Sequence, residues 1–179
     1  KEEDYASALE NLEPLDGVCF VAGNVKLIPP ALMNKKFIEQ SFDINLKSPL
    51  SLLGFLLKKR LIKNHSSIVF TSSVGRHSQA ECSAPYSAAK MGILGAVNAL
   101  ASDLSKKQIR VNSVSFDYVL TEMTENIDKD QFTDGIVDVS PVEFTATPYL
   151  FLLSNMSRWI TGQIIAADAG RMLSKTRYV

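Results

Sequence analysis

The chain has few cysteines and no formal net charge. Its two cysteines, Cys19 and Cys82, are too few for a disulfide framework, so a reducing cytoplasm is the expected location. The 19 basic and 19 acidic residues give a formal net charge of zero. A neutral chain has no electrostatic footprint for nucleic acid or an anionic membrane surface, so neither partner is expected. No apolar run reaches the ~20 residues that a membrane-spanning helix needs, which argues further against a membrane partner.

The composition that remains is that of an ordinary globular domain, 46% hydrophobic and 21% charged. A chain of 179 residues is long enough for a sizeable core, and one domain over residues 1–179 is expected. The lone histidines have no ligand-like companions, and the acidic stretch around Asp128, Asp130 and Asp134 lacks the glycine placement of a calcium loop. No metal site is therefore expected.

Strands and helices alternate along the chain. Apolar runs and turn residues predict strands at 18–22, 67–71, 109–115 and 162–167. Helices are expected at 5–12, at 35–60 with a bend near Pro49, at 85–106 and at 148–153, whereas 121–145 is polar and without a clear period. This order predicts an α/β fold with a doubly wound parallel sheet, in three layers α/β/α.

The motif Tyr86-Ser87-Ala88-Ala89-Lys90 is the most informative chemical feature. Positions i and i+4 share a helix face, so Tyr86 and Lys90 can point at the same substrate. A nearby ammonium is expected to lower the phenol pKa, which suits general acid–base work on an alcohol or carbonyl. Ser73, at the end of a separate predicted strand, would polarise the same oxygen.

Several segments, in this order, resemble the short-chain dehydrogenase/reductase family. They are Val21-Ala22-Gly23, Asp43-Ile44-Asn45-Leu46, the strand end Ile68 to Ser73, the Tyr86 to Lys90 box, Arg110 to Ser115, and Ile160-Thr161-Gly162-Gln163 with Asp168. The resemblance covers residues 16–172 and implies a Rossmann-like domain. It also implies NAD or NADP as the cofactor and a homodimer or homotetramer built through the two long helices.

The resemblance implies a role for each matching residue. Tyr86 would be the general acid in reduction and the base in oxidation, Lys90 would lower its pKa and hold the nicotinamide ribose, and Ser73 would orient the carbonyl. Asn45 would hold a water that links Lys90 to solvent. Further cofactor contacts are implied for Ala22 and Gly23 on the adenosine side and for Val119 and Thr121 near the carboxamide and phosphates.

The chain departs from the family pattern at three places. Phe116-Asp117 replaces a Pro-Gly turn, and its bulk and charge are expected to disturb cofactor placement. Phe20-Val21 replaces paired asparagines that tie neighbouring strands together. The segment between Thr121 and Ile160 is short, so it says little about the substrate.

The largest departure is the absence of a Gly-x-x-x-Gly-x-Gly turn for the pyrophosphate. The strand–helix–strand unit that carries this turn in the family is missing as well, which would leave the strand at 18–22 as an exposed apolar edge. We therefore expect the sequence to be incomplete, with the N-terminal strands of the sheet missing from it.

These observations predict an NAD(P)-dependent oxidoreductase of the 3-oxoacyl-carrier-protein-reductase-like type, interconverting a secondary alcohol and a ketone on a small-molecule substrate. Two alternatives stay open. One is a non-catalytic family member that binds cofactor weakly, motivated by Phe116-Asp117 and the missing glycine turn. The other is a sugar-nucleotide epimerase or dehydratase, which shares the Tyr-x-x-x-Lys motif.

Overall fold

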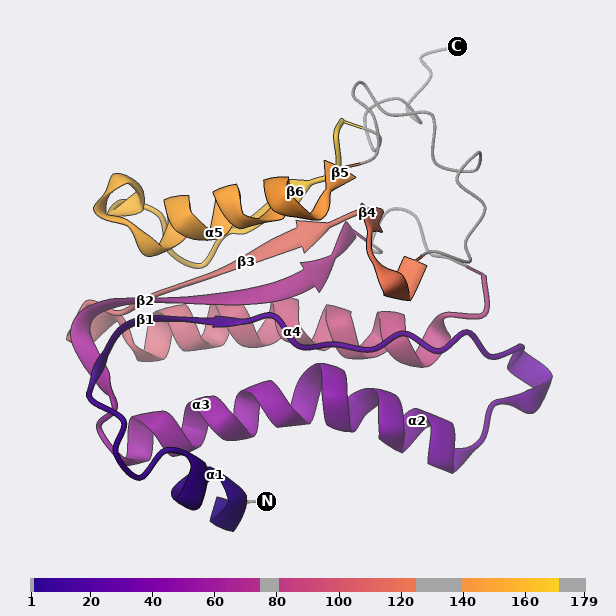
Figure 1. The fold of residues 1–179 in the computed structure, drawn as a ribbon, viewed down its shortest axis with the longest axis horizontal. Helices are drawn as coiled ribbons and strands as arrows, with labels where there is room; N and C mark the ends of the chain where they lie inside the picture. Colours follow the sequence, from indigo (N-terminus) through magenta and orange to yellow (C-terminus); the bar gives the residue numbers. More distant parts are fainter. Residues whose placement is uncertain (1, 75–80, 125–139, 171–179) are drawn as a thin grey trace.

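A parallel sheet forms the middle layer of the computed structural model, which describes residues 2–74, 81–124 and 140–170. Its four strands run in the order β1-β2-β3-β6, and a separate two-stranded pairing joins β4 to β5 (Figure 1). The strands are β1 (Leu15–Phe20), β2 (Ile62–Ser73), β3 (Arg110–Phe116), β4 (Val119–Leu120), β5 (Ser140–Pro141) and β6 (Ile164–Ala167).

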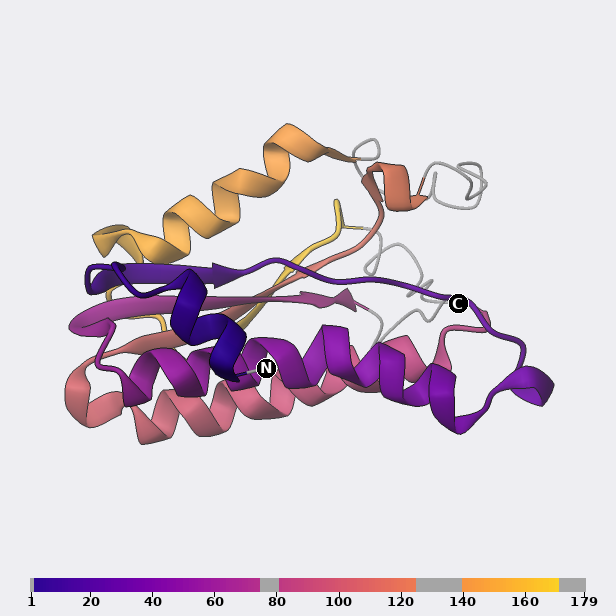
Figure 2. The ribbon, with the colours of Figure 1, turned by 60° about the horizontal axis from the view of Figure 1, so that its bottom comes forward.

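Helices cover both faces of this sheet. They are α1 (Glu2–Ala8), α2 (Lys35–Phe42), α3 (Ser48–Lys58), α4 (Ala84–Asp103) and α5 (Ala146–Leu153), with a π-helical turn η2 (Asp43–Lys47) and the short 3₁₀ turns η1 (Pro30–Leu32), η4 (Ser105–Lys107), η5 (Glu122–Thr124), η7 (Val142–Thr145) and η8 (Asn155–Ser157). Helices α3 and α4 lie on one face and α5 on the other, as both ribbon views show (Figures 1 and 2). The predicted three-layer α/β/α architecture is therefore confirmed.

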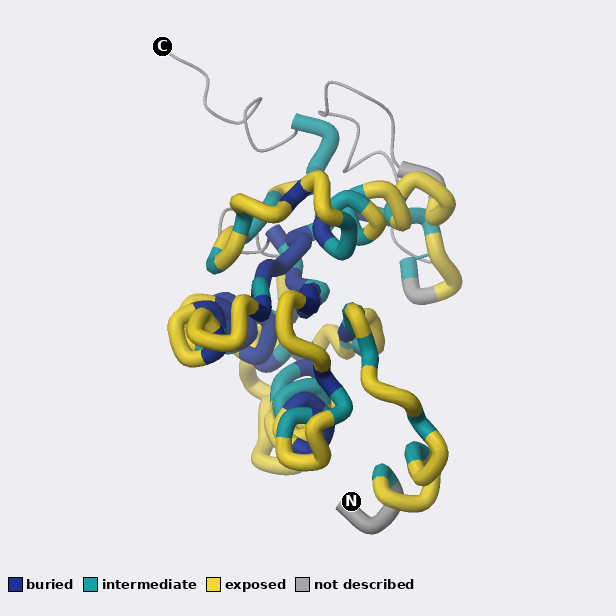
Figure 3. Tube along the Cα trace, turned by 90° about the vertical axis from the view of Figure 1, so that its left-hand side faces the viewer, coloured by how far each residue is buried: buried dark blue, intermediate teal, exposed yellow. Residues whose placement is uncertain are grey.

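The core lies between the sheet and the inner sides of α3 and α4 (Figure 3). Its buried side chains include Leu53 of α3, Ile93 and Val97 of α4, and Phe70 of β2. A smaller cluster under α5 holds Leu152 against β2 and β3. Burial of these apolar surfaces supplies the main driving force for stacking the three layers.

The first strand of the sheet is held to β2 by an aromatic pair. Phe20 and Phe70 are partners in the strand register, and their rings stack 4.8 Å apart at 15°. In the family pattern, paired asparagines that tie neighbouring strands together are expected at the positions of Phe20 and Val21. Pairing with β2 ends at Phe20, so β1 stops short of the predicted end at residue 22, and Val21 is exposed.

The long helix expected at 35–60 is interrupted, as predicted, close to Pro49. Helix α2 ends at Phe42, and η2 bridges to α3, where Pro49 occupies the first turn. Proline lacks an N–H and its ring clashes with the carbonyl four residues earlier, so a widened π turn relieves the clash. Asn45 lies inside this widened turn and is buried.

The other elements match the predictions apart from their ends. Strand β2 ends at Ser73 and α4 begins with Pro85 in its first turn, both as expected. Helix α1 ends at Ala8 instead of residue 12, and α5 begins two residues earlier than expected. The acidic residues considered for calcium, and His77, one of the two lone histidines, lie outside the described residues.

Candidate active site

The four expected catalytic residues come from three elements that meet at the carboxyl end of the sheet. Ser73 is the last residue of β2, Asn45 belongs to η2, and Tyr86 and Lys90 occupy the first two turns of α4. In open α/β sheets, ligands bind just outside the carboxyl ends of the strands. The fold therefore delivers these side chains to the edge where a ligand would lie.

Tyr86 and Ser73 share a side-chain hydrogen bond, so the strand end and the helix are joined at the proposed reacting group. Burial raises the pKa of the Tyr86 phenol above its ordinary value, and the bond from Ser73 partly offsets this rise. Desolvation of the phenolate outweighs this hydrogen bond, so the net direction is a rise, opposite to the lowered pKa expected from the sequence. The phenol is consequently protonated at neutral pH. The stabilising effect of Lys90 on the phenolate stays a prediction.

Lys90 is a buried cation, with 5% of its surface exposed. Its Nζ donates to the carbonyl oxygen of Thr71 at 3.0 Å and lies 5.9 Å from the centre of the Tyr86 ring. Burial lowers the pKa of Lys90 to about 8, since the charged form loses hydration. Lys90 is therefore charged at neutral pH but loses its proton in mildly alkaline solution.

Asn45 holds the loop that follows β1 against this lysine. Its Nδ2 donates to the backbone oxygens of Asn24 at 2.8 Å and Ser41 at 3.0 Å, and its Oδ1 accepts from Asn24 N at 3.1 Å. A Cβ on Gly23 would lie 3.1 Å from Asn45 Oδ1 and 3.2 Å from Lys90 Nζ. Glycine at this position lets the loop backbone approach both side chains.

The residues around Lys90 fit the ribose end of a nicotinamide cofactor. An ammonium has three N–H donors, and among the described residues Thr71 O accepts one of them. The remaining donors and the space left by the missing Cβ of Gly23 suit a polyhydroxylated ligand close to the Tyr86 phenol. For the pyrophosphate, the sequence holds no matching glycine turn.

The other expected cofactor residues lie near this edge without contacting the four catalytic candidates in any described interaction. Ala22 is exposed two residues beyond the end of β1. Val119 pairs with Ser140 in the small β4–β5 sheet, and exposed Thr121 is held by Thr124, whose Oγ1 accepts from Thr121 N at 2.9 Å. Their cofactor roles stay predictions.

The Phe116 side chain lies on the face of the sheet that α5 covers. Its ring packs 5.7 Å from the ring of Tyr149 on α5, within the apolar cluster on that face of the sheet. Strand alternation explains this, because Phe116 lies two residues after Val114, which faces the same cluster. The effect of Phe116 on cofactor placement stays a prediction. The backbone N–H of Asp117 donates to Ala167 O.

Three contacts at the end of β2 were missed by sequence reasoning. Ser72 Oγ donates to the carbonyl oxygen of Lys90 at 3.0 Å, Thr71 O binds Lys90 Nζ, and the Thr71 hydroxyl lies 2.5 Å from the Tyr149 hydroxyl. Thr71 and Tyr149 are 78 positions apart in the chain, so no local spacing could reveal their contact.

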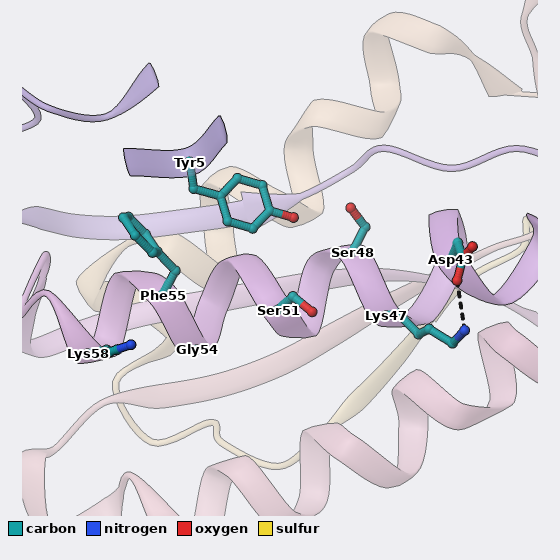
Figure 4. Close-up of a pocket in the computed structure, with 8 residues that line it drawn as sticks. All are labelled: Tyr5, Asp43, Lys47, Ser48, Ser51, Gly54, Phe55 and Lys58. Carbon is teal, nitrogen blue, oxygen red and sulfur yellow. Dashed lines mark hydrogen bonds and ion pairs between the residues drawn. The ribbon is translucent and has the colours of Figure 1, made fainter. Parts of the chain in front are cut away.

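One hollow borders α2 and η2, and another borders η2 and α3. One of about 420 Å³ lies beside the site, lined partly by Asn24, Asn45 and Pro85. The other, of about 510 Å³, lies along the outer side of η2 and α3, where side chains of α1 also reach it (Figure 4). None of the expected catalytic residues lines this second hollow, so it is separate from the site.

Comparison with known proteins identifies the family. A family model described as enoyl-(acyl carrier protein) reductase matches residues 2–171. A short chain dehydrogenase family protein from Francisella tularensis has a structure with a TM-score of 0.86 at 25% identity, covering 97% of this chain and 78% of that chain. The chain belongs to the short-chain dehydrogenase/reductase family. The family resemblance expected from the motifs is thus confirmed.

Two curated relatives are informative by name. The 3-oxoacyl-[acyl-carrier-protein] reductase of Rickettsia bellii is 27% identical over 96% of this chain and 73% of its own length. The 1,2-dihydroxy-1,2-dihydronaphthalene dehydrogenase of Pseudomonas putida is 34% identical over 76% of this chain, which spans 59% of that relative. The expected class, an oxidoreductase of an NAD(P)-dependent family, is confirmed.

In the described part of the chain, no helix has the length and apolar character needed to cross a membrane. The homodimer or homotetramer expected from the family stays a prediction, as does the cytoplasmic location.

Proposed function

We propose that this chain carries the acid–base half of an NAD(P)-dependent oxidoreductase that interconverts a secondary alcohol and a ketone. The observation that supports this most strongly is the Tyr86 phenol hydrogen-bonded to Ser73, with the buried ammonium of Lys90 one helical turn away. The names of the curated relatives, a 3-oxoacyl reductase and a dihydrodiol dehydrogenase, point to the same class of reaction.

In the reducing direction, Tyr86 donates its proton to the oxygen of the ketone. Burial supports this role, because it keeps the phenol protonated at neutral pH. Ser73 stabilises the negative charge that develops on the same oxygen by donating a hydrogen bond. When bound, the nicotinamide supplies the hydride in reduction and accepts it in oxidation.

Lys90 has two tasks in this proposal. Its ammonium holds the ribose hydroxyls, and its charge stabilises the phenolate that remains after Tyr86 has given up its proton. Because the pKa of Lys90 is about 8, both tasks are performed best below that pH. Asn45 orders the loop at Gly23 and is the expected anchor for a water that returns a proton to Lys90.

The test measures cofactor binding first and turnover second, in the complete protein. NADH and NADPH are titrated by nicotinamide fluorescence, and ketones of increasing size are then assayed with the cofactor that binds. The Tyr86→Phe variant is expected to bind cofactor normally and to lose about 10³-fold in turnover.

Tyr5→Phe is the matched control, because Tyr5, on α1, packs against Phe55 of α3 and lines the separate hollow along α3. This variant is expected to keep normal turnover. Retained activity in Tyr86→Phe would remove Tyr86 from the acid–base role. Failure of the complete protein to bind either cofactor would instead support the non-catalytic alternative.

A further inference from the structure

The last three residues of β2 each hold a different part of the catalytic pair. The carbonyl oxygen of Thr71 binds Lys90 Nζ, the hydroxyl of Ser72 donates to the Lys90 backbone oxygen, and the side chain of Ser73 bonds Tyr86. A small displacement of this strand end would therefore move the ammonium relative to the phenol. Misplacement of catalytic groups by even about 1 Å is costly in rate.

This strand end is supported unevenly by its neighbours. Pairing between β1 and β2 ends at Phe20 and Phe70, so Thr71 is the first residue of β2 beyond β1. On the other side, pairing with β3 continues as far as Ser73 and Phe116. Thr71 thus lies just beyond the end of the pairing with β1, and its carbonyl oxygen accepts a hydrogen bond from Lys90.

Tyr149 of α5 supports Thr71 from the face of the sheet opposite α4. Its hydroxyl lies 2.5 Å from Thr71 Oγ1, and its ring is held by Phe116 at 5.7 Å with an angle of 42° between the rings. Burial raises the pKa of Tyr149, so its hydroxyl keeps its proton at neutral pH. The contact is therefore a neutral, short hydrogen bond between two half-buried groups.

We propose that Tyr149 is a positioning residue for Lys90, because its hydroxyl fixes Thr71, whose carbonyl oxygen holds the lysine ammonium. The inference rests on the proposed function for the catalytic meaning of Lys90. It assigns to α5 a part in the active site although the helix supplies none of the four expected catalytic residues. The coupling passes through β2, from one face of the sheet to the other.

The test follows the titration of Lys90 by NMR of isotope-labelled lysine side chains in cofactor-free protein. Among the described residues, the groups near its ammonium are the Tyr86 ring from α4, the Asn45 side chain from η2, which approaches Gly23 beside it, and the Thr71 carbonyl from β2. In Tyr149→Phe, which removes one hydroxyl and leaves the ring, the Thr71 carbonyl is held less well. The charged lysine then loses part of a hydrogen bond, and its pKa is expected to fall by about half a unit.

Changes at Thr71 separate the proposed route from a general loosening of the fold. Thr71→Val is expected to reproduce the fall in the Lys90 pKa, and the double variant with Tyr149→Phe should be no worse than either single change. Thr71→Ser retains the hydroxyl and should titrate like the wild type. Tyr118→Phe is the matched control, because the Tyr118 hydroxyl donates to Thr124 O, away from β2.

Activity provides a second readout. The pH profile of kcat/KM should shift in Tyr149→Phe in the same direction as the Lys90 titration. Displacement of the ammonium should in addition lower kcat/KM by about fivefold near neutral pH. Unchanged Lys90 titration in both Tyr149→Phe and Thr71→Val, or additive effects in the double variant, would overturn the proposal. The titration needs no turnover, so an inactive wild type would refute the proposed function without deciding this inference.

Discussion

The two faces of the sheet bury very different amounts of apolar side chain. The face toward α3 and α4 carries the larger cluster, and the same helices and the turn between α2 and α3 hold Asn45, Tyr86 and Lys90. The face toward α5 has a small cluster around Leu152, and α5 leaves Leu150 exposed. These three residues thus belong to elements of the well-packed face, whereas Tyr149 of the thinner face contacts Thr71 of β2, whose carbonyl oxygen binds Lys90.

Core truncation should show the largest difference between the faces. Leu53→Ala is expected to lower the free energy of unfolding by about 4 kcal/mol, and Leu152→Ala by about 2–3 kcal/mol, since the smaller cluster relaxes more readily around a cavity. Both leucines are almost fully buried, so exposure does not distinguish them. Urea denaturation of the two variants measures the difference, and an equal or larger loss at Leu152 would break the comparison.

Removal of the Ser73 hydroxyl should lower turnover strongly with little change in stability. Ser73→Ala is expected to lose about 100-fold in kcat, because the developing charge on the substrate oxygen loses a hydrogen-bond donor. Ser105→Ala provides the control, since the Ser105 hydroxyl bonds Ser102 O at the exposed end of α4. Steady-state rates at saturating cofactor test this, and an undiminished kcat would exclude Ser73 from the reaction.

The buried charge of Lys90 should lower the free energy of unfolding at neutral pH. Its pKa is lowered from 10.5 to about 8, so between these values the unfolded chain binds the proton more tightly and wild-type stability rises with pH. Lys90→Met is therefore expected to be more stable than wild type by about 1–3 kcal/mol near pH 7, with the gain largely lost by about pH 10. Urea denaturation of cofactor-free protein at both pH values gives the comparison, and a gain that does not change with pH would contradict it.

The close approach at Gly23 offers a finer test of the site. Gly23→Ala places a methyl group 3.1 Å from Asn45 Oδ1 and 3.2 Å from Lys90 Nζ, which forces one of them to move. We expect about a tenfold loss in kcat/KM, as for other small displacements of catalytic groups. Gly54→Ala is the matched control, because its added Cβ would meet no atom within 4 Å beyond its chain neighbours and the nearby backbone of its own helix. Equal activity of the two variants would show that the Gly23 contact is unimportant.

The smallest effect is expected at the surface pair between Lys63 and Asp16. Their charged atoms lie 2.9 Å apart, but the two side chains are 47% and 86% exposed. Solvent screening makes such pairs weak, so Lys63→Ala should change the free energy of unfolding by less than about 0.5 kcal/mol. A clearly larger loss in urea denaturation would mean that this end of the sheet depends on charge as well as packing.

Sequence reasoning succeeded where a local pattern carries the structural information. The apolar run that ends at Ser73, the proline that opens α4 and the bend near Pro49 are all consequences of nearby residues. It failed for the pKa of Tyr86, which depends on burial by distant segments. It could not place the Phe116 ring, because the partner of this ring, Tyr149, lies far along the chain.

The sequence by itself determined the α/β class, the family and the spacing of Tyr86 and Lys90, because hydrophobic period, turn residues and a short helical motif act over a few positions. Only the tertiary structure decided that Lys90 is buried and that Gly23 packs between Asn45 and Lys90. It alone revealed that α5 reaches the site through Thr71. These properties depend on desolvation and on contacts between residues distant in sequence, which a local pattern does not encode.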